Sequence, residues 1–291
     1  MAGRTASLQQ RTLPQNHSSL DRRIEGKGGG TLIKEISPDI FVVENEEGGS
    51  NVGIVVGKDS ILIVDSTLFP SKFQQILDFC NPLARKPVIG VFLTHYHPDH
   101  SFGAMKSPLE KLVNENTQRV LESLPESYLK DLRSRLGSSG RELSGLAFER
   151  FIKIKDGSSV DLGSRTVRFF HLGGHTPDLT VAYVEDAGVL FASDLLITTV
   201  HAEIVEDSDL NAWTEAVERL YDLHIDHLVP GHGISVKGTE NLLFTKRYLE
   251  FAMSMIESLY HSDMKRLDLP SEFQQLRFPE LLAEGVVRKL G

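Results

Sequence analysis

Residues 94–100 read Thr-His-Tyr-His-Pro-Asp-His and contain four side chains able to bind a metal ion, namely His95, His97, Asp99 and His100. Imidazole and carboxylate groups suit zinc, and iron or manganese also accept them. His95 and His97 share one face of an extended chain because side chains alternate along it. Pro98 is expected to turn the backbone and to direct the last two ligands to a second point. An isolated histidine is usually a hydrogen-bonded surface or core residue, but this density of ligands predicts a metal site.

The elements that must position these ligands are strands. Residues 88–93 form an apolar run typical of a buried strand, so the cluster lies where a strand ends and a loop begins. Three further candidate ligands follow predicted strands in the second half of the chain, namely His175, Asp194 and His232. Glycines beside two of them let the backbone come close to a bulky centre. Each is weak evidence alone, but all three share the position of the first cluster.

The order His-x-His-x-Asp-His, then a distant histidine, an aspartate and a final histidine resembles the metallo-β-lactamase superfamily over roughly residues 31–235. The resemblance implies an α+β fold, an αββα sandwich of two mixed β-sheets packed face to face with helices outside. It implies two metal ions at one edge of the sheets. By position, the first metal would be held by His95, His97 and His175, and the second by Asp99, His100 and His232. Asp194 would bridge the two metals, and Asp65, at the end of an early strand, would support the site by hydrogen bonds.

The resemblance also implies a reaction. Two Zn²⁺ ions per chain, with iron or manganese as alternatives, would hold a bridging hydroxide that attacks the carbonyl of a small ester, thioester, lactone or β-lactam. Asp99 and Asp194 would be the catalytic carboxylates. The largest subclass of β-lactamases has cysteine at the Asp194 position, so this chain is more similar to the glyoxalase II, lactonase and general hydrolase branches. Two alternatives stay open, a phosphodiesterase or nuclease of the same superfamily and a sulfur dioxygenase with a single iron.

Composition limits the partners of the protein. A formal net charge of −9 over 291 residues argues against a nucleic-acid surface and favours a small-molecule substrate. The single cysteine excludes an intrachain disulfide and a cysteine-based zinc site. No apolar run reaches the roughly 18–20 residues of a membrane span, and no apolar signal core is present. We therefore expect a cytoplasmic protein without membrane contact.

Residues 1–30 are polar, end in three glycines and are predicted to be a disordered tail. We expect residues 31–291 to form a single domain in which two strand-rich halves make a sheet-on-sheet core. Predicted helices cover residues 70–80, 117–136 with a break at Pro125, and 210–223, and residues 137–140 are expected to be a flexible loop. The helical segment of about residues 239–290 is a candidate cap for the sandwich or an interface for a homodimer. His201 follows a predicted apolar run and is a candidate residue at the mouth of the pocket.

Overall fold

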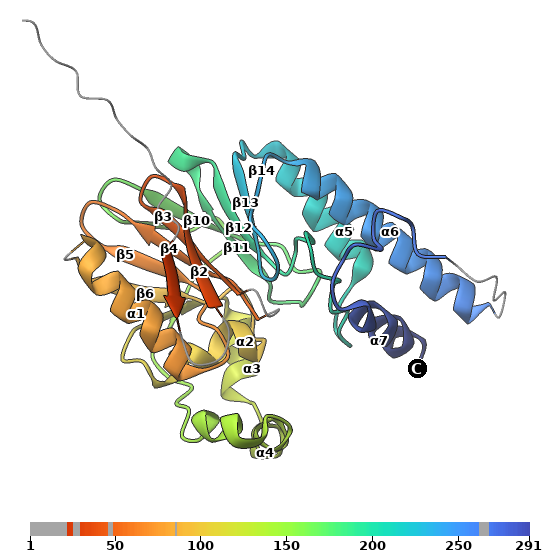
Figure 1. The fold of residues 1–291 in the computed structure, drawn as a ribbon, viewed down its shortest axis with the longest axis horizontal. Helices are drawn as coiled ribbons and strands as arrows, with labels where there is room; N and C mark the ends of the chain where they lie inside the picture. Colours follow the sequence, from red (N-terminus) through yellow and green to blue (C-terminus); the bar gives the residue numbers. More distant parts are fainter. Residues whose placement is uncertain (1–21, 26–29, 46–48, 85, 262–267) are drawn as a thin grey trace, which may run out of the picture.

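The computed structural model describes residues 22–25, 30–45, 49–84, 86–261 and 268–291. Within them the chain forms two mixed β-sheets that pack face to face, with helices on the outer sides (Figure 1). The predicted fold class, an α+β sandwich of αββα type, is confirmed.

The first sheet comes from the first half of the chain, and its strands lie side by side in chain order. They are β1 (Arg22–Glu25), β2 (Gly30–Ser37), β3 (Ile40–Asn45), β4 (Val52–Val56), β5 (Ile61–Val64), β6 (Val88–Phe92), β7 (Lys111–Val113) and β8 (Phe151–Lys153). Pairing is antiparallel from β1 to β5 and parallel from β5 to β8. The parallel strands β5 and β6 therefore end at the same edge, where Asp65 and residues 94–100 follow them.

The second sheet has the order β14-β13-β12-β11-β10-β9. Its strands are β9 (Ser159–Asp161), β10 (Thr166–His171), β11 (Thr180–Val184), β12 (Val189–Ser193), β13 (His227–Pro230) and β14 (Val236–Lys237). The pair β12 and β13 is parallel, and the other pairs are antiparallel. Asp194 and His232 follow the carboxyl ends of this parallel pair. Ligands of open sheets commonly bind at the carboxyl ends of strands, so both sheets offer such an edge.

The core between the sheets is apolar and closely packed. Phe92 of β6 and Phe169 of β10 lie with ring centroids 4.6 Å apart, and both are fully buried. At Gly53 of β4 an added Cβ would lie 2.2 Å from the Phe191 ring of β12, so a side chain there would force the sheets apart. The strands β4 and β5 are buried along their whole length, which explains their unbroken apolar sequences.

The helices are α1 (Pro70–Ala84), α2 (Pro98–Ser101), α3 (Glu115–Glu122), α4 (Glu126–Arg135), α5 (Leu210–Arg219), α6 (Glu240–Tyr260) and α7 (Pro279–Leu290). Of these, α1 lies outside the first sheet, and α5 and α6 lie outside the second (Figure 1). On α1, Phe73, Ile76 and Cys80 recur at helical spacing and join the buried cluster of the first sheet. On α5, Trp213 and Val217 do the same for the second sheet.

The C-terminal helices share a core with the second sheet. Leu242 and Tyr248 of α6 and Leu282 and Val286 of α7 belong to the same buried cluster as Trp213. Helices α6 and α7 therefore pack on the second sheet through shared apolar contacts. No helix in the described part of the chain has the length and apolar character needed to cross a membrane.

Two local expectations differ from the structure. Residues 1–21 and 26–29 of the predicted tail lie outside the described residues, but Arg22–Glu25 form β1 and pair with β2. The strand β1 was not predicted because its sequence, Arg-Arg-Ile-Glu, is not an apolar run; it is defined by its backbone pairing with β2. Residues 137–140 begin a 3₁₀ helix, Gly137–Leu143, instead of a flexible loop, because Gly140 packs against the backbone of Arg133 and Leu143 is buried. The turn expected at Pro98 is the first turn of α2.

Candidate metal centre

Two local structures present the first four candidate ligands. The loop after β6 carries His95 and His97, with ring centroids 4.6 Å apart. Pro98 then opens α2, a position that proline favours because the first helical N–H needs no partner. His97 occupies the position before that helix without capping it through its side chain, so its ring stays directed at the cluster. The short helix turns Asp99 and His100 away from His97, as the sequence suggested.

Tight turns carry the other three candidate ligands, His175, Asp194 and His232. His175 follows Gly174, which has φ +95° and lies so close to Trp213 that an added Cβ would meet its backbone at 2.5 Å. Asp194 follows the last residue of β12. His232 follows Gly231, where a Cβ would lie 1.7 Å from Asp194 Oδ1. Gly174 is required because of its positive φ and its contact with Trp213, and Gly231 is required because of its contact with Asp194 alone.

The structure brings all seven candidate ligands together in two sets. Two sets of side chains have potential ligand atoms within 4.8 Å of one another. They are His95, His97, His175 and Asp194 in the first set, and Asp99, His100 and His232 in the second.

Asp194 lies between the two sets. Its Oδ2 atom is 3.4 Å from His175 Nε2 and 3.9 Å from His95 Nε2. The same carboxylate reaches the second set, with Oδ1 3.2 Å from His100 Nε2 and Oδ2 3.6 Å from His232 Nε2. This central place is the one that a bridging carboxylate needs.

The ring nitrogens of the site fit a cation better than they fit each other. His175 Nε2 lies 3.2 Å from His97 Nδ1, and His100 Nε2 lies 3.3 Å from His232 Nε2. His95 Nε2 is buried and has no hydrogen-bond partner among the described residues. Nitrogen lone pairs that converge in a buried space are unfavourable unless a proton or a metal ion lies among them. The donor set, nitrogen and oxygen without sulfur, suits a divalent metal and is typical of zinc.

The protonation behaviour of the histidines separates the two sets. Burial, together with nearby imidazoles, lowers the pKa of His95 well below its usual value. Burial also lowers the pKa of His175 to about 3. Burial alone would lower the pKa of His232 as well, but Asp194 and Asp99 raise it to about 10. Negative charge that favours a proton on His232 would equally attract a divalent cation.

Asp65 orients His100, as expected from its place at the end of β5. Its Oδ2 atom accepts a hydrogen bond from His100 Nδ1 at 2.8 Å, which leaves His100 Nε2 facing the cluster. Its Oδ1 atom accepts from the Thr94 amide at 2.8 Å. Such a carboxylate fixes the tautomer and direction of a histidine ligand.

Hydroxyl and amide groups near the ligands were missed from the sequence. Thr94 Oγ1 contacts Asp65 Oδ2 at 3.0 Å, His95 Nδ1 at 3.0 Å and Ser193 Oγ at 2.8 Å, so one hydroxyl links both sheets. The Asn51 amide donates to the carbonyls of Pro230 and Gly233 at 3.0 Å and holds the His232 turn. The only sequence signal for Asn51 is a polar residue directly before the buried strand β4.

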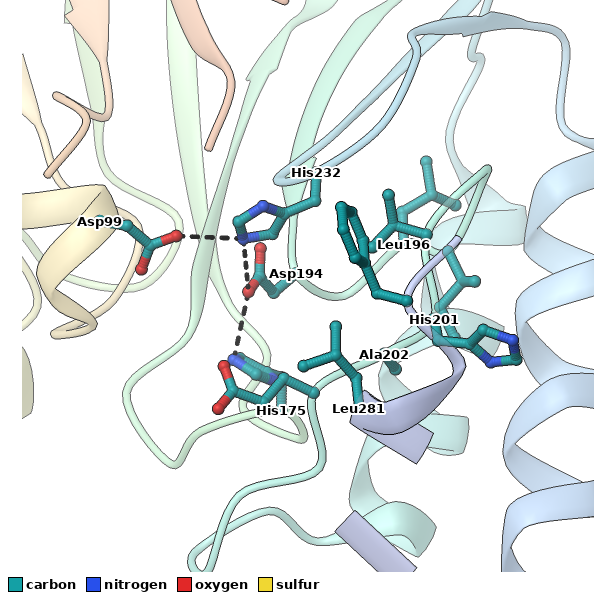
Figure 2. Close-up of a pocket in the computed structure, with 12 residues that line it drawn as sticks. Asp99, His175, Asp194, Leu196, His201, Ala202, His232 and Leu281 are labelled. Carbon is teal, nitrogen blue, oxygen red and sulfur yellow. Dashed lines mark ion pairs between the residues drawn. The ribbon is translucent and has the colours of Figure 1, made fainter. Parts of the chain in front are cut away.

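A cavity of about 240 Å³ opens beside Asp99, His175, Asp194 and His232. Figure 2 shows the ligands on one side of it and apolar side chains such as Leu196 and Leu281 on the other. His201 lines the cavity, but its ring points away from the ligands (Figure 2), and His201 Nδ1 lies 2.9 Å from the Tyr248 hydroxyl. Its contribution to the pocket therefore comes from its other atoms.

Comparison with known proteins finds several similar proteins. The chain is 20% identical over 265 residues to a linear primary-alkylsulfatase of Pseudomonas sp. (strain ATCC 19151), covering 79% of this chain but only 50% of that protein. It is 23% identical over 234 residues to the acyl-coenzyme A thioesterase MBLAC2 of Homo sapiens, covering 72% and 83% of the two chains. A solved metallo-β-lactamase from Pontibacter korlensis aligns with a TM-score of 0.58 and 19% identity over 75% of this chain and 98% of that one.

These relatives are named as a sulfatase, a thioesterase and a metallo-β-lactamase. The sequence model of the metallo-β-lactamase superfamily matches residues 45–232, a range that begins at the end of β3 and closes on His232. That range includes all seven candidate ligands and most of both sheets. With this match and the shared fold, the chain belongs to the metallo-β-lactamase superfamily.

Proposed function

We propose that the protein is a hydrolase that uses two divalent metal ions, preferably zinc, to cleave a small ester, thioester, lactone or β-lactam. The observation that carries this proposal is the position of Asp194, whose carboxylate lies within 4 Å of histidines from both sets of ligands. A single-metal site would need only one set. The second set, with Asp99 Oδ2 3.2 Å from His232 Nε2, would have no purpose there.

The candidate ligands would hold two metal ions. One ion would be held by His95, His97 and His175, and the other by Asp99, His100 and His232. Asp194 would contact both ions. When bound, two such ions polarise the carbonyl oxygen of a substrate and lower the pKa of water toward neutrality. Asp99 lines the cavity with a side chain that is about a third exposed. It would orient the attacking water and pass on its proton, with no serine or cysteine nucleophile needed.

Sulfate-ester hydrolysis is a second candidate, favoured by the similarity to the alkylsulfatase. A sulfate group is an anion, and proteins usually recognise such groups with arginine or lysine. Among the described residues, no lysine or arginine lines the cavity beside the ligands. The cavity therefore supports a neutral carbonyl substrate over a sulfate ester.

Metal content and a substrate panel test the proposal. The purified protein should carry two zinc ions per chain by elemental analysis. The zinc-loaded protein is then assayed with a chromogenic cephalosporin, an acyl-homoserine lactone, a glutathione thioester, an alkyl sulfate and a phosphodiester. Hydrolysis of a carbonyl substrate that disappears in His97→Ala supports the proposal. One iron per chain with oxygen consumption, or hydrolysis of the phosphodiester or the sulfate alone, contradicts it.

A further inference from the structure

The wall of the cavity opposite the ligands comes from two segments that are distant in the sequence. The segment after β12 contributes Leu196, Ile197, Val200 and Ala202, and the start of α7 contributes Phe278 and Leu281. The second contribution lies beyond residue 232, outside the part of the chain that matches the superfamily. The part of the wall that comes from α7 therefore lies outside the matched range, while the segment after β12 lies within it.

Backbone hydrogen bonds fasten the two segments together. Val200 and Arg277 form a parallel bridge, in which the His201 amide donates to the Arg277 carbonyl and the Arg277 amide donates to the Thr199 carbonyl, both at 2.9 Å. Farther back, the amide of Ile197 donates to the Thr245 hydroxyl of α6 at 3.0 Å. The wall is held from behind, so its shape is determined before a substrate arrives.

Helix α7 adds its own contacts to the first segment. Gly285 packs so closely that an added Cβ would lie 2.7 Å from the Ile204 side chain. Arg288 donates to the Ile204 carbonyl at 2.6 Å, and Lys289 donates to the Ser208 carbonyl at 2.6 Å. These contacts fix α7 against residues 204–208 and so fix Leu281 at the cavity.

Phe278 is the strained point of this arrangement. It has φ +62°, a conformation that a bulky residue adopts rarely, and it lies directly before α7. Strained backbone persists where surrounding contacts enforce it, and such positions are concentrated at binding sites. Here the bridge at Arg277 on one side and the buried face of α7 on the other supply those contacts.

Outside the candidate ligands, the charged residue that lines the cavity is acidic, namely Glu203, and no described lysine or arginine lines it. The adjoining cavity, which shares Asp99 and Glu203, adds Glu206 and Asp207, with Arg288 as its cation. The guanidinium of Arg288 already donates to a backbone carbonyl. Away from the candidate ligands, an anionic part of a substrate would therefore meet mostly carboxylates.

From these observations we infer that the apolar cavity binds the uncharged acyl chain of a carbonyl substrate, and that Leu281 and Phe278 determine how long that chain is. The inference rests on the proposed hydrolase function and names its substrate class, short to medium acyl esters or lactones without an anionic group on the acyl side. The cavity places such a chain against Leu196 and Leu281 while its carbonyl faces Asp194 (Figure 2).

Chain-length dependence tests the inference. The zinc-loaded protein is assayed with para-nitrophenyl esters from acetate to decanoate. In the wild type, kcat/KM should rise about fourfold per added methylene group, the value expected for one methylene removed from water, until the cavity is full. Leu281→Trp should shift that limit to shorter esters, and Leu281→Ala should shift it to longer ones.

Val287→Trp is the matched control, because Val287 is also on α7 but is 66% exposed on the surface. It should leave the chain-length profile unchanged. A flat profile in the wild type, or the same limit in the wild type and both Leu281 variants, would overturn the inference. Preference for an alkyl sulfate over the ester of equal chain length would overturn the selection for uncharged substrates.

A binding measurement separates this inference from the proposed function. Straight-chain methyl ketones resemble the substrate but are not hydrolysed, and their affinity can be followed by calorimetry. Affinity that rises with chain length and is weakened for long ketones by Leu281→Trp supports the cavity assignment even if no ester is cleaved. Ester cleavage with ketone affinities that ignore both chain length and Leu281 contradicts the assignment and leaves the hydrolase proposal intact.

Discussion

Replacement of Asp65 by asparagine should weaken one metal site selectively. The carboxylate accepts hydrogen bonds from His100 Nδ1 and from the Thr94 amide, each at 2.8 Å. Asparagine has nearly the same shape but only one acceptor oxygen. If that oxygen keeps the Thr94 amide, the NH₂ group faces His100 Nδ1, which must then lose its proton. The proton of His100 would move to Nε2, the atom that faces His232, and Nε2 would no longer offer a lone pair to a metal ion.

The size of the effect follows from the kind of contact that is lost. Removing a group that orients a metal-binding histidine costs about 10- to 100-fold in metal affinity, which corresponds to about 1.4–2.8 kcal/mol. The loss should fall on the set that contains His100. The set of His95, His97 and His175 does not contact Asp65 directly, so it should change less.

Competition with a chromogenic chelator measures the two zinc affinities. The Asp65→Asn protein should keep one tight zinc ion and bind the second about 10- to 100-fold more weakly. Asp78→Asn is a suitable control, because it removes the same charge from an exposed position on α1. Equal losses at both sites, or no loss at either in a folded protein, would refute the assigned role of Asp65.

Three further outcomes are expected. Asp194→Ala should lower kcat/KM at least about a hundredfold, because it removes the group between the two ligand sets. Its circular dichroism spectrum should be unchanged, and near-wild-type turnover in the metal-replete variant would contradict the assignment. Chelation should lower the unfolding midpoint, and zinc at 100 times its dissociation constant should return about 2.7 kcal/mol per site in a denaturation experiment; a midpoint that ignores zinc would count against a metal centre. Gly231→Ala should displace Asp194, because the new methyl group would lie 1.7 Å from Asp194 Oδ1. Elemental analysis should then show a reduced zinc content, and full zinc content would show that the turn relaxes freely.

Much of the fold followed from hydrophobic pattern. The run of residues 88–93 was predicted as a buried strand and forms β6, since it is a short run of β-branched and aromatic residues. The break at Pro125 also lies where predicted, between α3 and α4. The strand β1 escaped prediction because its pairing depends on the backbone, and residues 137–140 did so because Gly140 is fixed by a tertiary contact.

The ligand set was predictable because its first four members lie within six residues of one another and the rest follow strands. The groups that orient these ligands were harder to find. Thr94 and Asn51 act through hydrogen bonds to segments up to 182 residues away, and no local pattern encodes those partners. The cavity wall is harder still, because Phe278 has a backbone conformation that its residue type does not favour.

The division of ligands between the sheets links metal binding to the packing of the sandwich. His95, His97, Asp99 and His100 follow β6 of the first sheet, while His175, Asp194 and His232 come from turns of the second. A metal ion held by both groups would act as a cross-link between the two sheets, and its binding free energy would add to their apolar contact. Thr94 Oγ1, 2.8 Å from Ser193 Oγ, makes the same connection without metal. The geometry of the site should therefore depend on the core between the sheets. Phe92 is buried against Phe169 of the opposite sheet and is not a candidate ligand. Because Phe92→Ala would leave a cavity between the two sheets, it should weaken zinc affinity.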